Sequence, residues 1–221
     1  MREVSTLGSY QVVYQGGEGE FVEKKSRFIA TIQPVESEEE AAAWISMLKK
    51  KYWDASHNCS AFTVGRNHEL TRCSDDGEPS GTAGRPMLDV LLREEIHNAV
   101  VVVTRYFGGT LLGTGGLVRA YQKSVQAGLA ASVIIEKQQG WMLDIGTDYN
   151  GLGKLQYLLA QRKIPVLDTE YTEKVVIHAM IPQEKKEEFE KAVIESTSGT
   201  AVLVWGHQKE FAVIGEKVEL F

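Results

Sequence analysis

The sequence predicts an α+β protein of two domains. Apolar residues recur every second position in some segments and every third or fourth in others, which is typical of strands and amphipathic helices. Glycine- and proline-containing turns separate these segments. The last third has the predicted order βαββαβ, the ferredoxin-like arrangement. Because 221 residues suffice for two modest domains, we place the boundary in Glu136 to Gly140, giving domains 1–136 and 137–221.

The N-terminal domain is predicted to open with a β-hairpin, in which Gly16, Gly17 and Gly19 separate the strands Tyr10–Tyr14 and Phe21–Ile32. A helix follows and runs to Tyr52. Ser37 and Glu40 form a capping-box pattern at its start.

Four further elements complete this domain. Two short strands, 59–64 and 70–73, flank a turn, and a helix over 86–93 has proline near its start. A valine-rich strand through 100–103 then leads through a glycine-rich turn into a helix over 114–131. The polar loop 74–84 is rich in turn formers.

In the C-terminal domain, strands are predicted over 141–146, 165–171, 174–181 and 201–205, with one more over 211–214. Helices are predicted over 152–162 and 183–195, because their leucine, phenylalanine and valine residues repeat at helical spacing.

Composition excludes several classes. No apolar run approaches the ~20 residues that span a bilayer, and the N-terminus has no secretion-signal pattern. Two cysteines form no disulfide framework, so we expect a cytoplasmic protein. A formal charge of −6 disfavours nonspecific nucleic-acid binding, and we expect neither DNA specificity nor membrane binding.

The glycine-rich turn is the strongest candidate site. A strand that passes through glycines into a helix N-terminus directs free N–H groups and the positive end of the helix dipole at one spot, which suits phosphate. The candidate phosphate- or nucleic-acid-binding residues are Arg105, Tyr106, Phe107, Gly108, Gly109, Gly113, Thr114, Gly115, Gly116 and Arg119. The alternative is that these glycines permit tight turning and close helix-on-strand packing. Arg119 is expected either to reach an anion at the helix tip or to pair with an acid of the Asp75–Glu78 loop.

The acidic loop and one histidine are the candidates for catalysis. Asp76 and Glu78, with His57, are suited to general acid–base chemistry, whereas a solvated turn at Asp76-Gly77 is the structural alternative. His57 and Cys59 point to the same face of a strand, yet the sequence offers no residue to orient a Cys–His pair. The residue spacing favours no metal site, and we expect no cofactor.

Three separated blocks resemble the YigZ/Impact family, in the bacterial two-domain form. The blocks are His57-Asn58-Cys59, the run Asp76 to Gly84, and the run Arg105 to Tyr121 with Arg105-Tyr106-Phe107-Gly108-Gly109. The resemblance implies an N-terminal domain similar to one in a small-subunit ribosomal protein and to domain IV of elongation factor G, and a C-terminal domain similar to its domain V. Those relatives contact ribosomal RNA, and the eukaryotic branch regulates translation initiation.

Three functions are consistent with these observations. The first is a non-catalytic, translation-linked regulator that binds RNA or a ribosome-associated protein through the glycine-rich turn. The second is an enzyme, a hydrolase or one acting on a phosphate-bearing ligand, that uses the Asp75–Glu78 loop and His57. The third is a protein adaptor, which predicts a sizeable apolar patch on the sheet of the second domain.

Overall fold

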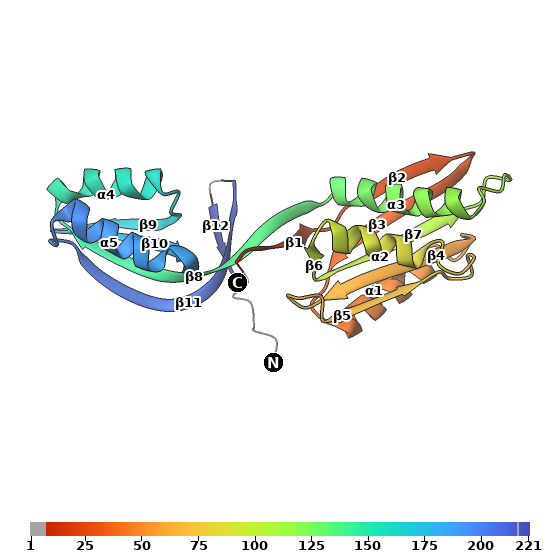
Figure 1. The fold of residues 1–221 in the computed structure, drawn as a ribbon, viewed down its shortest axis with the longest axis horizontal. Coiled ribbons are helices and arrows are strands. Elements are labelled where there is room, and N and C mark those ends of the chain that lie inside the picture. Colours follow the sequence, from red (N-terminus) through yellow and green to blue (C-terminus); the bar gives the residue numbers. More distant parts are fainter. Residues whose placement is uncertain (1–7, 216) are drawn as a thin grey trace. The chain divides into compact units, whose positions relative to one another are not determined.

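The computed structural model describes residues 8–215 and 217–221 of the chain. The chain divides into two compact units, Tyr10–Ile135 and Glu136–Phe221, the latter together with Gly8 and Ser9. Each unit combines helices with a sheet that is mostly antiparallel (Figure 1). The α+β class is therefore confirmed. None of the helices in the described residues is long and apolar enough to cross a membrane.

A five-stranded antiparallel sheet forms the centre of the first unit. Its strands, in spatial order, are β2 (Glu18–Glu23), β3 (Ser26–Pro34), β7 (Ala99–Tyr106), β4 (His57–Val64) and β5 (Leu70–Ser74). Two short strands, β1 (Tyr10–Gln15) and β6 (Ile96–His97), pair in parallel beside it.

Helices cover both faces of this sheet. Helices α2 (Gly84–Arg93) and α3 (Thr114–Ala130) share a core with one face of β3, β4 and β7. Helix α1 (Glu38–Lys51) packs on the other face, against Phe62 and Val100. Because β7 is covered on both sides, an unbroken run of valines suits it, and Val100 to Val103 are fully buried.

The predicted start of α1 is confirmed, with one difference in its cap. The Ser37 hydroxyl accepts a hydrogen bond from the Glu40 amide at 3.2 Å. The Glu40 carboxylate accepts from the amide of Glu36 at 2.8 Å, one residue before the cap. Both ends of the capping box are therefore used, and they satisfy amides that the helix itself leaves free.

The prediction of a hairpin between the first two strands is wrong, because the first strand pairs with a different strand. β1 pairs with β6, and the segment predicted as one strand, 21–32, contains the end of β2, a turn and β3. Lys24 and Lys25 both have positive φ, at 46° and 66°, as a two-residue hairpin turn requires. Gly17, before β2, and Gly19, within it, have another role. A Cβ on Gly17 would lie 2.3 Å from the Ala131 backbone, and one on Gly19 would lie 2.3 Å from the backbone of Ala127 in α3.

The second unit has the predicted ferredoxin-like topology. Its elements are β8 (Val133–Thr147), α4 (Tyr149–Gln161), β9 (Val166–Tyr171), β10 (Val175–Pro182), a 3₁₀ turn η1 (Gln183–Lys185), α5 (Lys186–Thr197), β11 (Val202–Ile214) and β12 (Lys217–Leu220). The sheet order is β9-β10-β8-β11-β12, with antiparallel neighbours. Both helices share one core with the same face of this sheet (Figure 1).

Two strands of the second unit are longer than predicted. β8 begins at Val133, and its residues Gln138 to Gly140, which lie before the predicted strand, pair with β11. The predicted strands 201–205 and 211–214 are parts of the single strand β11. An irregularity in the pairing after Trp205 separates them.

Candidate anion-binding cleft

The acidic loop and the glycine-rich turn line one cleft of about 540 Å³ in the first unit. Ser56 and His57 contribute from the start of β4, and Gly77 to Pro79 from the acidic loop. The rest of the lining comes from the end of β7, the glycine-rich turn and the first turns of α3: Arg105, Phe107, Leu111, Leu112, Gly113, Thr114 and Leu117. The lining of the cleft therefore combines titratable and apolar side chains.

Arg105 is held in a buried ion pair. Its Nη1 lies 2.6 Å from Glu78 Oε1, and the two side chains are only 6% and 3% exposed. Glu78 Oε1 also accepts a hydrogen bond from the Tyr121 hydroxyl at 2.8 Å. The expectation of a free Arg105 cation at the turn is therefore wrong, because Glu78 neutralises its charge within the fold.

One hydrogen-bond donor of this guanidinium is left over. Arg105 Nη2 lies 3.4 Å from the Ser26 hydroxyl, but Arg105 Nε is buried without a partner. The guanidinium also packs between the rings of Phe28 and Phe107, at 5.3 and 5.6 Å from their centres. Buried donors without a partner are rare in folded proteins.

Arg119 lies apart from Arg105 and does not line the same cleft. It is exposed and lines a separate small hollow with Phe21 and Glu23. It forms no ion pair with the acidic loop, since Arg105 takes the Glu78 carboxylate instead. Its Nη1 would lie 3.5 Å from a Cβ placed on Gly115, so the guanidinium lies back over the first turn of α3.

The N-terminus of α3 is open. Gly113 at the cap has φ of 71° and offers no side chain, and the first turn contains no acidic residue. Within the described residues, no hydrogen bond reaches the amides of Thr114, Gly115 or Gly116. These amides and the helix dipole suit an anion in the adjacent cleft.

The N-terminus of helix α2, which follows the acidic loop, is capped by a carboxylate of the protein. The Asp75 carboxylate accepts hydrogen bonds from the amides of Gly81, Ala83 and Gly84 at 2.8 to 3.0 Å. Burial alone would raise the pKa of Asp75, but these three amides outweigh it and lower the pKa. Asp75 therefore serves as an internal anion for α2, in the way that an external anion would serve α3.

The remaining predicted residues of the turn fall into two groups. Phe107 is half exposed and lines the cleft. Tyr106 points to the opposite face of β7, as neighbours on a strand do, and its hydroxyl donates to Asp54. Gly108 is a packing glycine, since a Cβ there would lie 2.0 Å from the Lys25 backbone, and Gly109 adopts φ of 82°.

Of the three predicted catalytic residues, His57 and Glu78 lie together in the cleft, and the side chain of Asp76 does not. The Asp76 carboxylate is used in the fold, because it accepts from the Asn58 amide at 2.6 Å and pairs with Lys49 at 2.5 Å. The Asp76 carbonyl lies 2.9 Å from His57 Nδ1, and His57 Nε2 lies 3.9 Å from Glu78 Oε2. His57 and Glu78 therefore meet in the cleft, and Asp76 acts on them only through its carbonyl.

The Cys59 thiol is buried behind this site. Its sulfur lies 3.0 Å from the Asp75 carbonyl and 3.3 Å from the Tyr121 hydroxyl. Burial raises the pKa of Cys59 to about 12 and also raises the pKa of Tyr121. The thiol is therefore inert, and Tyr121 stays protonated as a donor to Glu78. The apolar spacing along α3 predicts Tyr121 as a core residue and gives no role to its hydroxyl.

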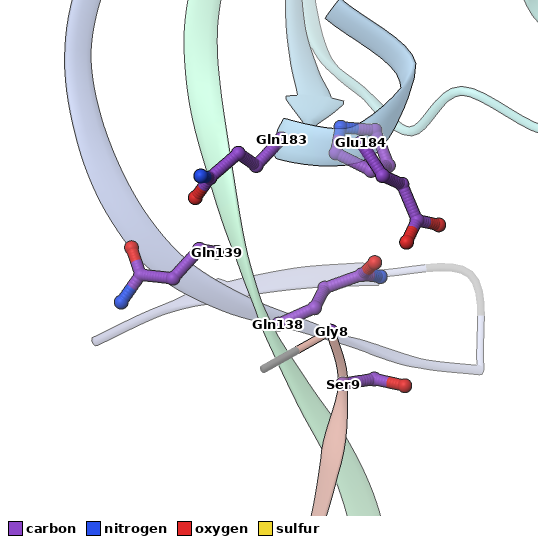
Figure 2. A pocket seen from close by; sticks show the side chains of 7 residues that line it. Gly8, Ser9, Gln138, Gln139, Gln183 and Glu184 are labelled. Atoms are coloured by element: carbon purple, nitrogen blue, oxygen red, sulfur yellow. The ribbon is translucent and has the colours of Figure 1, made fainter. Parts of the chain in front are cut away.

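A second hollow, of about 400 Å³, lies in the second unit (Figure 2). Gln138 and Gln139 of β8, Gln183 and Glu184 of η1, and the segment at Gly8 and Ser9 surround it. Gln139 donates to Glu210, and Gln183 accepts from Gln208. Its lining contains one carboxylate and no buried ion pair, so it gathers no reactive groups.

The sheet of the second unit has a polar cluster on the face away from its helices. His178 Nδ1 lies 2.6 Å from Asp144 Oδ1, and Nε2 lies 3.5 Å from Glu170. The hydrogen bond to Asp144 raises the pKa of His178. Val202 and Val204 are exposed beside this cluster, so the apolar patch that an adaptor would need is interrupted. No group of metal-binding side chains occurs among the described residues.

Comparisons with known proteins agree with this layout. The Impact N-terminal domain matches residues 24–129, and a domain of unknown function, DUF1949, matches residues 145–200. The IMPACT family member YvyE of Bacillus subtilis is 41% identical over 87% of this chain and 89% of its own length.

More distant matches extend the comparison. The IMPACT family member YigZ of Escherichia coli is 33% identical over 82% of this chain and 90% of its own length. A solved structure described as a hypothetical protein is 31% identical, covers 90% of this chain and 97% of its own, and superposes with a TM-score of 0.58. These matches cover both units, so the chain belongs to the IMPACT family in its two-domain bacterial form.

Proposed function

We propose that this protein is a translation-linked regulator that binds RNA by taking a phosphate group into the cleft. The observation that carries the proposal is the open N-terminus of α3, where three amides without a partner border a cleft. Phosphate is the anion that such a helix start most commonly receives. The translation link rests on the resemblance of the first domain to proteins that contact ribosomal RNA.

The buried ion pair limits how the cleft can hold a phosphate. Because Glu78 neutralises Arg105, the cleft has no strong charge of its own, and the protein as a whole carries −6. Binding must therefore depend on the helix amides and on a base stacked against Phe107. Stacking of one base on an aromatic ring contributes about 1 to 3 kcal/mol.

A charge placed in the first turn of α3 tests the proposal. In Gly115→Asp, a carboxylate in the first turn of α3 competes for the free amides and repels phosphate. The helix itself is stabilised by the lost glycine and by the favourable dipole. We expect RNA affinity, measured by filter binding, to fall about tenfold or more.

Two variants serve as controls. Gly115→Ala removes the same glycine without adding charge, and there is ordinary space for its Cβ. Gly153→Asp adds the same charge to α4 in the second unit, at a position with open space. Both should bind RNA like the wild type. If Gly115→Asp binds RNA as tightly as Gly115→Ala, the amides of α3 do not receive the phosphate.

The orientation of His57 supports hydrolysis of a phosphate ester as a second candidate. A carbonyl can only accept, so the Asp76 carbonyl fixes the hydrogen on Nδ1 and leaves Nε2 free on the cleft side. In such a reaction, Nε2 takes a proton from water as the water oxygen bonds to phosphorus. The bond from phosphorus to the ester oxygen breaks, and the leaving alcohol oxygen takes that proton from Nε2. Turnover by the wild type that His57→Gln abolishes would favour this candidate over simple binding.

A further inference from the structure

Two hydrogen-bond acceptors from residues that line the cleft lie close together without a hydrogen bond between them. Glu78 Oε1 is fully engaged by Arg105 and Tyr121. Glu78 Oε2, by contrast, receives no hydrogen bond from the described residues, although the side chain is 3% exposed. Glu78 also lines the cleft. Oε2 is therefore available to a hydrogen-bond donor that enters the cleft.

The second acceptor is His57 Nε2. Because His57 Nδ1 must donate to the Asp76 carbonyl, the neutral ring presents a lone pair at Nε2. This nitrogen lies 3.9 Å from Glu78 Oε2, too far for a direct hydrogen bond. One amino group placed about 2.9 Å from each atom would donate to both.

The other residues that line the cleft indicate what kind of molecule carries this amino group. Phe107 offers a half-exposed aromatic face at the rim, and Leu112, Leu117 and Pro79 add apolar surface. The volume of about 540 Å³ is in the range of small-ligand sites. The open amides of α3 border the same cleft and suit a phosphate. A flat ring with an amino group, attached to a phosphate, meets all three requirements.

We propose that the cleft takes one nucleotide whose base carries an exocyclic amino group, and that Glu78 Oε2 and His57 Nε2 receive that group. This inference rests on the proposed binding of an RNA phosphate and adds selectivity to it. Cytosine and adenine satisfy the two acceptors. Uracil and hypoxanthine place a carbonyl oxygen at the same position, where it faces a carboxylate oxygen and leaves it without a donor.

Two nearly isosteric pairs of nucleotides test the inference. Binding of CMP and UMP, and of AMP and IMP, is measured by calorimetry at one fixed pH. We expect each amino-bearing nucleotide to bind about tenfold or more tightly than its oxo partner, because a site built to receive a donor rejects the analogue without one. Equal affinity within either pair would overturn the inference.

Variants locate the selectivity. In Glu78→Gln, the amide oxygen takes the contacts to Arg105 and Tyr121, and the NH₂ group replaces Oε2. The preference for CMP over UMP should then vanish or reverse. His57→Leu provides an independent test if the first variant does not fold, and it should reduce the preference severalfold. A preference unchanged in either folded variant would place the selectivity elsewhere.

The same experiment separates this inference from the proposed function. Gly115→Asp should weaken CMP and UMP by the same factor, because it acts on the phosphate and not on the base. If RNA binds in a Gly115-dependent way but CMP and UMP bind equally or not at all, the base selectivity fails and phosphate binding stands. If neither RNA nor any nucleotide binds, both proposals fail.

Discussion

Arg105→Met should destabilise the first unit more than any surface substitution. The methionine keeps most of the apolar stem that packs on Phe28, but it removes the guanidinium that compensates Glu78. Glu78 then keeps the Tyr121 hydroxyl as its single donor. A buried carboxylate without its cation is the expected cause of instability.

The expected magnitude follows from the burial of the pair. The two side chains expose only 6% and 3% of their surface, so solvent screens their interaction little. Removing one partner of a buried ion pair costs about 3 to 5 kcal/mol. Replacing both partners, in Arg105→Met with Glu78→Met, removes the unpaired charge as well. The double variant should therefore be more stable than Arg105→Met alone.

Urea denaturation followed by tryptophan fluorescence measures this effect. Trp44 and Trp53 lie in the first unit, so a background with Trp141→Phe and Trp205→Phe makes the signal specific to that unit. All variants are made in this background. A loss below about 1 kcal/mol for Arg105→Met, or a double variant whose loss equals the sum of the two single losses, would refute a tightly coupled buried pair.

Other predictions concern structure outside the ion pair. Asp75→Asn should cost about 1 kcal/mol near neutral pH, as loss of a helix cap does. Because the folded pKa of Asp75 is lowered below 3.8, its contribution is present above that value and is lost as pH falls through the folded pKa. Urea denaturation across pH should show this acid loss in the wild type and less of it in the variant. In thiol labelling, Cys73 is exposed and Cys59 is buried with a pKa of about 12, so one thiol should react in the native protein and both in denaturant. Replacing Lys24-Lys25 by Asn-Gly should raise the unfolding free energy by up to about 1 kcal/mol, since both positions have positive φ; no gain in urea would contradict this turn type.

Elements defined by local signals could be predicted, and their pairing partners could not. The Ser37 cap, the valine-rich strand and the helix after the glycine-rich turn each depend on residues within one segment, and all three are present. The pairing of β1 with β6 depends on residues about 85 positions apart. Glycines beside β1 indicated a hairpin, whereas the structure uses them for close contact with α3.

The burial of Arg105 could have been derived from the phase of its strand. Val101 and Val103 face the core shared with α2 and α3, and period-two alternation places Arg105 on the same side. A cation on a buried face requires a carboxylate partner. The same phase places Tyr106 on the opposite face, where it contacts Asp54. The identity of the partner, Glu78, depends on where the acidic loop folds, and no local pattern gives that.

Local sequence also fails to distinguish the open helix start from the closed one. The cap residues of α2 and α3 are Ala83 and Gly113, and neither has a side chain that can accept a hydrogen bond from the helix. Only the fold brings Asp75 to the amides at the start of α2, which belong to residues eight and nine positions further along the chain. Within the described residues, no carboxylate reaches the amides at the start of α3. The loop that could supply one instead sends Glu78 to Arg105 and Tyr121. The α3 amides therefore stay available because the nearby carboxylates are committed elsewhere, and this is a property of tertiary structure that a glycine count in the turn does not contain.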